Sequence, residues 1–399
     1  MRVTLTIGNQ GNARARSLSA VVTRRSLPGS QGIAGTVLDL RENEICNVIA
    51  ERVSAVLRIP RSDRSGASMR AITNAFDEYI VSKHIEEHYD FQTSIGSIFD
   101  APHELSEESY ESKSITFGCL VDANNNDTTE IGAKFPGAFL KTKKYKALSD
   151  GYRTAYYISN SGSVQNFVDL DKFDQTPLVA THYYPDWAEP LALSSRKRRI
   201  GIALSRQGDI LVFDNGTLRF TYRYGQWQYW NHAHLINLLR DRTRAQKVAR
   251  KILGRVVGTI YRAALDVSFR RSGGLFVILR RKKDLTKIVR RGDSVFDHSD
   301  RNEADREFDT VLANHTIQTL SRRILVELAS LDGAIVVSNS GKILAYGAIL
   351  QPKKSGPLKG TEGSRTKAAI GASNFGLAVK VSSDGDIVIY HEAKEFIRI

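Results

Sequence analysis

The spacing of apolar residues predicts helices and short strands in the first half of the chain. Apolar residues recur at helical spacing over 38–58, at Ile45, Val48, Ile49, Val53 and Leu57. A second helix is predicted over 69–88, and the acidic stretch 100–115 is predicted to be a loop. Apolar runs at 114–122, 150–170 and 200–224 predict strands, and Asn215-Gly216 between two of these runs is a strong hairpin signal.

From Asn231 onward the pattern changes to long helices that alternate with apolar strands. We predict helices at 232–253, 255–270, 311–330 and 364–373, strands at 275–279, 334–338, 342–350, 376–382 and 387–390, and a loop at 292–310. This order indicates an α/β or α+β domain with a mixed central sheet flanked by helices. We place the domain boundary near residue 228, so that 1–227 form a separate α+β domain and 228–399 a second domain.

One pattern occurs twice. The segment 201–213 (GIALSRQGDILVF) resembles 376–390 (GLAVKVSSDGDIVIY), because each has an apolar strand, a Gly-Asp turn and another apolar strand. It could be a duplicated sheet unit, or two unrelated hairpins that use the same turn chemistry. We favour the second interpretation.

Charge is distributed unevenly between the two halves. The chain has 399 residues and a formal net charge of +14. Residues 226–399 hold 30 Lys and Arg against 17 Asp and Glu, whereas residues 1–225 hold 27 against 26. Within 240–291, 17 cations accompany three acids. Such a field attracts polyanions, including nucleotides, nucleic acid and acidic membrane surfaces; the alternative is a solvated helix face.

Composition also argues against several classes of protein. The two cysteines, Cys46 and Cys119, provide neither a disulfide framework nor a zinc-binding spacing. No run of about 18 uncharged apolar residues is present, so we expect no transmembrane segment. We therefore expect a soluble, cytoplasmic protein.

Two segments near the C-terminus carry the residue types that nucleotidyl transfer requires. Asp332-Gly333-Ala334 stands at the start of a predicted strand, where a carboxylate can activate a hydroxyl or hold a metal. The loop Gly363-Ser364-Arg365-Thr366-Lys367 leads into a predicted helix. Backbone N–H groups at that helix start, with Ser364 as the expected N-cap, can hold a triphosphate. Arg365 can contact two phosphate oxygens at once, and Lys367 adds a point charge.

Together these segments resemble the diadenylate cyclase domain, the catalytic module of the DNA-integrity scanning protein and its relatives. The resemblance runs from about 255 to 390 and begins with Phe-Arg-Arg-Ser-Gly-Gly-Leu-Phe-Val-Ile at 269–278. It includes Asp332-Gly333-Ala334, the family's Asp-Gly-Ala motif. At 363–369 the family typically has Gly-Thr-Arg-His-Arg-Ala-Ala, and at 381–385 Val-Ser-Glu-Glu-Thr-Gly.

The resemblance implies a nucleotidyltransferase that condenses two ATP molecules into cyclic di-AMP and two pyrophosphates. Two protomers would face each other in a homodimer or higher homo-oligomer, regulated by a sensor-like domain at 1–227. Asp332 and Arg365 would be catalytic, and Gly333, Ala334, Gly363, Ser364, Arg365, Thr366 and Lys367 would bind the nucleotide. Asp332 and Asp384 would hold Mg²⁺ or Mn²⁺.

Four positions depart from the family pattern. Leu331 replaces a His that often precedes Asp-Gly-Ala, Thr366 and Lys367 replace a His and an Arg, and Ser383 replaces the first Glu. A degenerate cyclase that only binds nucleotide is therefore the second hypothesis. A nucleic-acid-binding protein that uses the basic stretch 240–255 is the third and is not favoured.

Overall fold

The computed structural model describes residues 2–9, 16–23, 40–58, 76–110, 113–125, 134–140, 148–173, 182–243, 248–296, 302–351 and 363–399. Internal contacts divide the chain into two compact units. Unit 1 comprises 1–182 and 187–230, and unit 2 comprises 183–186 and 231–399. The division after residue 230 falls three residues beyond the predicted boundary near 228, and the short segment 183–186 joins the second unit.

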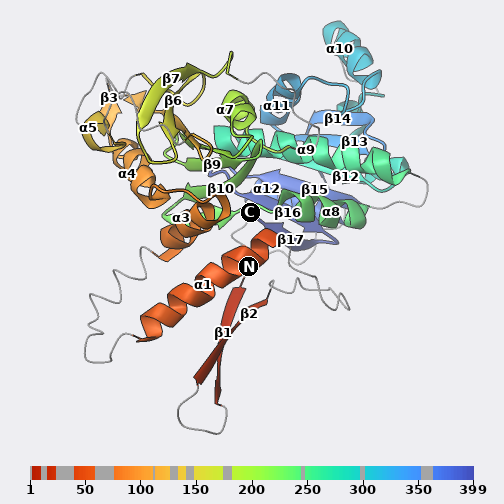
Figure 1. Ribbon diagram of the computed structural model, residues 1–399. Coiled ribbons are helices and arrows are strands. Elements are labelled where there is room, and N and C mark those ends of the chain that lie inside the picture. Colours follow the sequence, from red (N-terminus) through yellow and green to blue (C-terminus); the bar gives the residue numbers. More distant parts are fainter. Residues whose placement is uncertain are drawn as a thin grey trace. The chain divides into compact units, whose positions relative to one another are not determined.

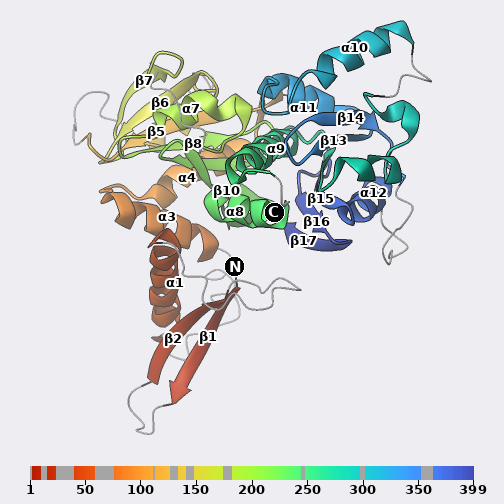
Figure 2. The same ribbon diagram turned by 90° about the vertical axis from the view of Figure 1, so that its right-hand side faces the viewer.

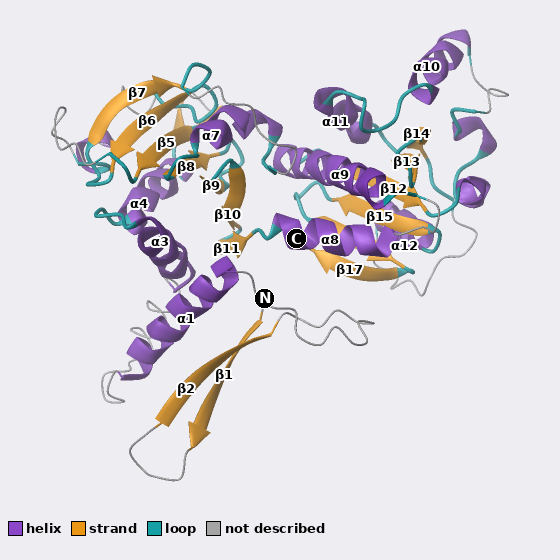
Figure 3. Ribbon diagram, turned by 45° about the vertical axis from the view of Figure 1, so that its right-hand side comes forward, coloured by secondary structure: helices purple, strands orange, loops and turns teal. Residues whose placement is uncertain are grey.

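The described part of unit 1 contains two antiparallel strand pairs, β1-β2 and β3-β4, and a larger mixed sheet. Its elements are β1 (Arg2–Asn9), β2 (Arg16–Thr23), α1 (Leu40–Arg58), α3 (Phe76–Tyr89), α4 (Ile95–Ser106), β3 (Ser109–Tyr110), β4 (Lys113–Ser114), β5 (Phe117–Asp122), α5 (Gly137–Leu140), β6 (Thr154–Ser159), β7 (Val164–Asp169), α7 (Glu189–Ser194), β8 (Arg199–Leu204), β9 (Ile210–Asp214), β10 (Thr217–Arg223) and β11 (Gln226–Tyr229). The seven-stranded sheet has the order β11-β10-β9-β8-β5-β6-β7. Helices α3 and α4 lie on one side of this sheet and α7 on the other (Figure 1, Figure 3).

Unit 2 is built around a six-stranded mixed sheet. Its elements are α8 (His232–Thr243), α9 (Arg250–Arg270), β12 (Gly274–Leu279), the 3₁₀ helices η3 (Lys282–Lys287) and η4 (Arg291–Asp293), α10 (Glu303–Ala313), α11 (Arg322–Ser330), β13 (Ala334–Ser338), β14 (Ile343–Ala348), α12 (Ser364–Ser373), β15 (Gly376–Val381), β16 (Ile387–His391) and β17 (Lys394–Arg398). The strand order is β14-β13-β12-β15-β16-β17. Helices α10 and α11 lie near β14, at the opposite end of the sheet from β17 (Figure 2).

The buried strands explain why this sheet needs cover on both faces. Every residue of β12 is buried, so successive side chains of that strand require apolar partners on opposite sides. Leu275, Val277 and Leu279 join a core that includes Ala369 and Ala372 of α12. The alternate residue Ile278 instead lies with Leu239 of α8 and Val257 and Ile260 of α9. Helix α12 therefore covers one face, and α8 and α9 cover the other.

Six strands of the unit 1 sheet have the same topology as the six strands of the unit 2 sheet. In each, the first strand of the motif pairs in parallel with the second (β5 with β6, β12 with β13), and every other pairing is antiparallel. The order β10-β9-β8-β5-β6-β7 in unit 1 therefore corresponds to β17-β16-β15-β12-β13-β14 in unit 2. Unit 1 adds β11 beyond this shared set.

The register of the two sheets is also the same. In unit 1, one set of residues paired across neighbouring strands, from β6 to β10, forms the row Tyr156, Cys119, Ile202, Val212, Phe220. The corresponding row in unit 2 runs Ile335, Phe276, Val379, Ile389, Ile397. In the last three strands the two rows differ by a constant 177 positions, as 379 − 202, 389 − 212 and 397 − 220 each show. A shift of one residue would turn every side chain to the other face, so a shared register is a demanding match.

Two turns repeat as well. The sequence Ser-Asn-Ser-Gly occurs at 159–162 and at 338–341, and in each copy the first Ser hydroxyl contacts the second, at 3.0 and 2.9 Å. In the β8–β9 and β15–β16 turns, Ser205 and Ser382 each accept the N–H of the Asp four residues later, both at 3.1 Å. Our interpretation of the two hairpins as unrelated is therefore wrong, because the chain contains the same sheet unit twice.

Several predicted elements differ from the structure. The predicted helix 311–330 is two helices, α10 and α11, and α10 begins at Glu303, inside the segment predicted to be a loop. The predicted helix 232–253 ends at Thr243 in α8, and α9 begins at Arg250 rather than 255. Residues 100–106 belong to α4 rather than to a loop, and 69–75 lie outside the described residues. The errors at 100–106 and 303–310 occur where charged surface residues obscure the apolar period that marks a helix.

Candidate functional site

Asp332 occupies the turn between α11 and the central strand β13. Helix α11 ends at Ser330, Leu331 is the C-cap residue in an extended conformation, and β13 begins at Ala334. The Asp332 side chain is 97% exposed, and its Oδ1 accepts the N–H of Gly333 at 3.1 Å. A carboxylate held this openly just before an interior strand is available to a ligand.

Glycine at position 333 lets the chain make this turn. Gly333 has φ of +106°, and a Cβ atom there would lie 2.4 Å from the carbonyl carbon of Gly347. Both the backbone conformation and the close approach of β14 exclude a side chain. Ala334, the next residue, is buried and pairs with Ala348 of β14. These two residues shape the backbone that presents Asp332, rather than offering side-chain chemistry of their own.

The predicted phosphate loop lies at the start of α12. The helix begins at Ser364, and Gly363 is the N-cap residue, with no side-chain cap. The prediction of Ser364 as the N-cap is therefore wrong by one position. The first backbone N–H groups of a helix have no partner within the helix, so they remain available to an anion. Residues 352–362, which precede this helix, lie outside the described residues.

Arg365 joins the two predicted segments. Its Nη2 atom lies 3.6 Å from Oδ1 of Asp332. Its other terminal nitrogen, Nη1, lies 2.7 Å from the position that a Cβ atom would take on Gly273. Gly273 has φ of +72° and directly precedes β12, so the absence of a side chain there leaves room for the guanidinium group. The backbone N of Ser383 is 3.7 Å from the same position, so the β15–β16 turn also lies beside Arg365.

A further cation, Lys380, lies at this site and was missed in the sequence. Lys380 is on β15, and its Nζ donates a hydrogen bond to Oγ1 of Thr366 at 2.8 Å. Burial, followed by the nearby Arg398, lowers the pKa of Lys380. The only signal in the sequence is a lysine within an otherwise apolar strand, GLAVKV. Lys367, the cation that we did predict, is exposed on α12.

The carboxylates of the site are too few to hold a metal without help. Asp384 is exposed in the turn 382–386 and directly follows Ser383, whose backbone N lies near Gly273. Within the described ranges, no three His, Cys, Asp or Glu side chains group closely enough to hold a metal ion. Mg²⁺ commonly uses one or two protein carboxylates and takes its other ligands from phosphate and water. The donor set at Asp332 therefore suits a metal that arrives with a triphosphate, and not a resident metal.

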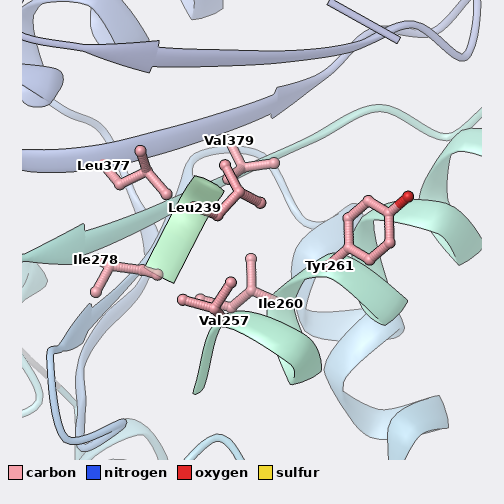
Figure 4. Close-up of a pocket in the computed structure, with 7 residues that line it drawn as sticks. All are labelled: Leu239, Val257, Ile260, Tyr261, Ile278, Leu377 and Val379. Atoms are coloured by element: carbon pink, nitrogen blue, oxygen red, sulfur yellow. The ribbon is translucent and has the colours of Figure 1, made fainter. Parts of the chain in front are cut away.

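An apolar pocket on the other face of the unit 2 sheet is unsuited to a nucleotide. It is lined by Leu239, Val257, Ile260, Tyr261, Ile278, Leu377 and Val379 (Figure 4). Its one polar group, the Tyr261 hydroxyl, points away from the pocket and pairs with Nδ1 of His232 at 2.9 Å. A triphosphate placed there would lose its hydration without gaining partners.

The basic stretch is interrupted in the structure. Helix α8 ends at Thr243 and α9 begins at Arg250. Within the basic stretch 240–255, Arg244 and Lys247 lie outside the described residues, and Lys251 is exposed on α9. The basic stretch 240–255 is therefore not one continuous helix, because residues 248–249 before α9 are not helical. Among the described helices, none is both long enough and apolar enough to cross a membrane.

Comparison with known families assigns the class of unit 2. Residues 261–395 match the family described as DAC, the nucleotide-binding domain of the DisA bacterial checkpoint controller. This is a nucleotide-binding domain, and the matched range contains Asp332, Arg365 and Lys380. The chain therefore carries a domain of the diadenylate cyclase family. No curated protein matches the chain.

Two solved structures are similar to part of the chain. One is a hypothetical membrane-spanning protein from Bacillus cereus, with 21% identity over 41% of this chain and 74% of that one, at a TM-score of 0.26. The other is a double mutant of DacA from Staphylococcus aureus, with 21% identity over 37% of this chain and 89% of that one, at a TM-score of 0.24.

Proposed function

We propose that unit 2 is a diadenylate-cyclase-type nucleotidyltransferase. In each of two steps, the 3′-hydroxyl of one ATP attacks the α-phosphate of the other, and pyrophosphate leaves. After both steps the ring of cyclic di-AMP is closed and two pyrophosphates have been released. Because each step needs two nucleotides in opposed orientations, two protomers combine as a homodimer or within a larger homo-oligomer.

The observation that carries this proposal is the position of Arg365 beside Asp332. The carboxylate belongs to the turn before β13 and the guanidinium to the first turn of α12, and 3.6 Å separates them. The attacking hydroxyl and the phosphate that it attacks must also lie side by side. The reaction therefore needs a proton acceptor for the hydroxyl close to a hydrogen-bond donor for the phosphate oxygens. Asp332 takes the hydroxyl proton, and Arg365 contacts the phosphate oxygens.

Lys380 supplies charge that the motif itself lacks. Relative to the family pattern, Thr366 and Lys367 replace a His and an Arg, so two fixed donors are changed. The hydrogen bond from Lys380 to Thr366 places an ammonium group at the same helix start. We propose that Lys380, Lys367 and the N–H groups of Ser364 and Arg365 together neutralise the triphosphate.

The proposed metal enters with the nucleotide. Asp332 would hold a Mg²⁺ or Mn²⁺ ion, with Asp384 as the second candidate ligand. The ion would neutralise charge on the triphosphate and its leaving pyrophosphate. The protein residues retain their own tasks, since Arg365 and Lys380 orient the phosphates.

The proposal is tested with purified full-length protein, ATP, and Mg²⁺ or Mn²⁺. We expect cyclic di-AMP identified by mass, with two pyrophosphates released for each ring. Asp332→Asn is expected to lower product formation by about 10²- to 10⁴-fold while the thermal unfolding midpoint remains unchanged. Arg323→Ala is the matched control, because Arg323 is 84% exposed and pairs with Asp186 outside this site.

The second hypothesis, a nucleotide-binding sensor without turnover, remains an outcome of the same experiment. Stabilisation by ATP without release of pyrophosphate would favour it. Product formation that survives Asp332→Asn would contradict the assigned role of Asp332. The regulatory role of residues 1–227 and a cytoplasmic location also belong to the proposal.

A further inference from the structure

Unit 1 repeats the fold of unit 2, so each position of the candidate site has a counterpart in unit 1. Ile335 and Tyr156 occupy the same position in the shared register. Asp332 lies three residues before Ile335, and Arg153 lies three residues before Tyr156. The carboxylate of unit 2 therefore corresponds to an exposed arginine in unit 1. A guanidinium group cannot accept a proton from a hydroxyl or bind a cation.

The carboxylate nearest to this position in unit 1 is already engaged. Asp150 precedes Gly151 as Asp332 precedes Gly333, but it lies six residues before Tyr156, whereas Asp332 lies three residues before Ile335. Its Oδ1 accepts N–H groups from Tyr152 and Arg153 at 2.8 Å and from Thr154 at 3.0 Å. Although burial opposes it, this set of backbone hydrogen bonds lowers the pKa of Asp150. Asp150 shapes the turn and is a poor general base.

The cations of the phosphate loop have no counterparts either. The helical segment 187–194, WAEPLALS, contains no Lys or Arg, and Pro190 removes one backbone N–H near the start of α7. With the offset of 177 positions that relates β8 to β15, Ala203 corresponds to Lys380. The described segments of unit 1 that correspond to α12 and β15, namely α7 and β8, thus lack, at the corresponding positions, the ammonium, the guanidinium and part of the amide set that α12 and β15 provide in unit 2.

Aromatic packing takes the place of the ion pair. The rings of Tyr152, before β6, and Trp187, before α7, have centroids 4.8 Å apart. The guanidinium of Arg206, in the β8–β9 turn, lies 5.5 Å from the Tyr152 ring centroid. The segments before β6 and α7 and the β8–β9 turn correspond, in unit 2, to the turn before β13, the start of α12 and the β15–β16 turn. Those are the segments that carry Asp332, Arg365 and Ser383. The contact stabilises the same edge of the sheet without providing a phosphate site.

We propose that unit 1 is a non-catalytic copy of the nucleotidyltransferase fold, so that each chain has one nucleotide site and its reaction partner is a second copy of the chain. The repeat preserves the sheet register and both turns but not the acid or the cations. A shared fold does not require a shared activity. This inference rests on the proposed function of unit 2, because it assigns the nucleotide site to that unit.

The first test is the number of nucleotides bound by each full-length chain, measured by calorimetry with a non-hydrolysable ATP analogue and Mg²⁺. We expect one site in the wild-type protein, the same site with its affinity lowered about ten- to a hundredfold in Arg365→Ala, and one site of unchanged affinity in Arg206→Ala. Thermal unfolding shows that each variant is folded. Two sites per chain would place a second nucleotide in unit 1 and overturn the inference while leaving catalysis by unit 2 intact. A single site whose affinity Arg365→Ala leaves unchanged would overturn both the inference and the assignment of the site to unit 2. Absence of any site in the wild-type protein would overturn the inference and the proposed function together.

The second test asks whether the second nucleotide in the reaction is held by another copy of the chain or by unit 1 of the same chain. Wild-type and Asp332→Asn chains with different affinity tags are coexpressed, and the mixed assembly is purified through both tags. We expect the mixed assembly to give no cyclic product, since only one of the two attacks has its carboxylate. Ring closure by this assembly at half the wild-type rate or more would show that one intact chain suffices, and would overturn the inference.

Discussion

The guanidinium of Arg365 lies 3.6 Å from the carboxylate of Asp332, although the two residues belong to different elements of unit 2. Neither group is deeply buried, since Asp332 is 97% and Arg365 is 35% exposed. An exposed ion pair of this kind contributes roughly 0–1 kcal/mol to stability. The pair is therefore important for chemistry rather than for stability. It keeps a carboxylate and a hydrogen-bond donor for phosphate side by side and accessible.

Substitution of Asp332 is expected to separate activity from stability. Asp332→Asn keeps the shape of the side chain but removes the proton acceptor, so we expect kcat to fall by about 10²- to 10⁴-fold. The free energy of unfolding should change by less than about 0.5 kcal/mol, because the side chain is exposed. Product mass analysis and urea unfolding measure the two effects. A variant that retained most of its kcat would remove Asp332 from the reaction.

Arg365 is expected to act through its forked geometry as well as its charge. Arg365→Ala should weaken ATP binding by about ten- to a hundredfold, the worth of one charge-assisted hydrogen bond or two. Arg365→Lys should recover only part of this loss, since an ammonium group cannot contact two oxygens in one plane. Titration with the ATP analogue measures both. Full recovery by lysine would show that charge alone matters.

Lys380 is expected to bind phosphate rather than merely to support Thr366. Lys380→Met retains the apolar stem on β15 but removes the ammonium group, and we expect ATP affinity to fall about tenfold. Thr366→Val removes the hydroxyl that accepts the hydrogen bond and should have a smaller effect. If the two variants weakened ATP binding equally, Lys380 would act only through Thr366.

Gly333 is expected to be far less tolerant than Gly363. Gly333→Ala introduces a Cβ atom 2.4 Å from the carbonyl carbon of Gly347 and forces alanine to adopt φ of +106°. We expect a loss of about 2 kcal/mol or more in the free energy of unfolding. In the control, Gly363→Ala, the new Cβ atom meets nothing within 4 Å, so the loss should stay below about 1 kcal/mol. Equal losses would contradict the close approach of β14.

His84 is expected to make unit 1 sensitive to acid. Burial, then the charges of Arg41 and His88, lower the pKa of His84 from 6.5 to about 4. Since the folded state resists protonation, the stability from neutral His84 is present above pH 6.5 and is lost as the pH falls from 6.5 towards 4. The loss amounts to about 3 kcal/mol over that range.

The comparison of unfolding at pH 7.5 and pH 4.5 measures this effect. His84→Phe should reduce the pH dependence, because phenylalanine cannot be protonated and can pack against Phe220, whose ring centroid is 5.8 Å from that of His84. His315→Gln, a substitution of a partly exposed histidine, should leave the dependence unchanged. An unaltered dependence in His84→Phe would assign the acid sensitivity to other groups.

The sequence by itself determined much of unit 2. Continuous apolar runs bounded by Gly, Asn and Asp predicted β12, β13, β15 and β16 almost to the residue, since buried strands and tight turns have strict local requirements. The helix at 364–373 was also predicted correctly. The acid and the phosphate loop were recognisable because their residue types follow from the chemistry.

Only the tertiary structure decided which of these residues meet. Lys380 looked like a polar residue in an apolar strand, and its contact with Thr366 depends on how α12 packs on β15. The sequence showed one hairpin of the repeat but did not decide between duplication and coincidence. Strand pairing and register depend on backbone hydrogen bonds between distant segments, and many different apolar side chains satisfy them. Arg153 could be matched to Asp332 only after the register of both sheets was known.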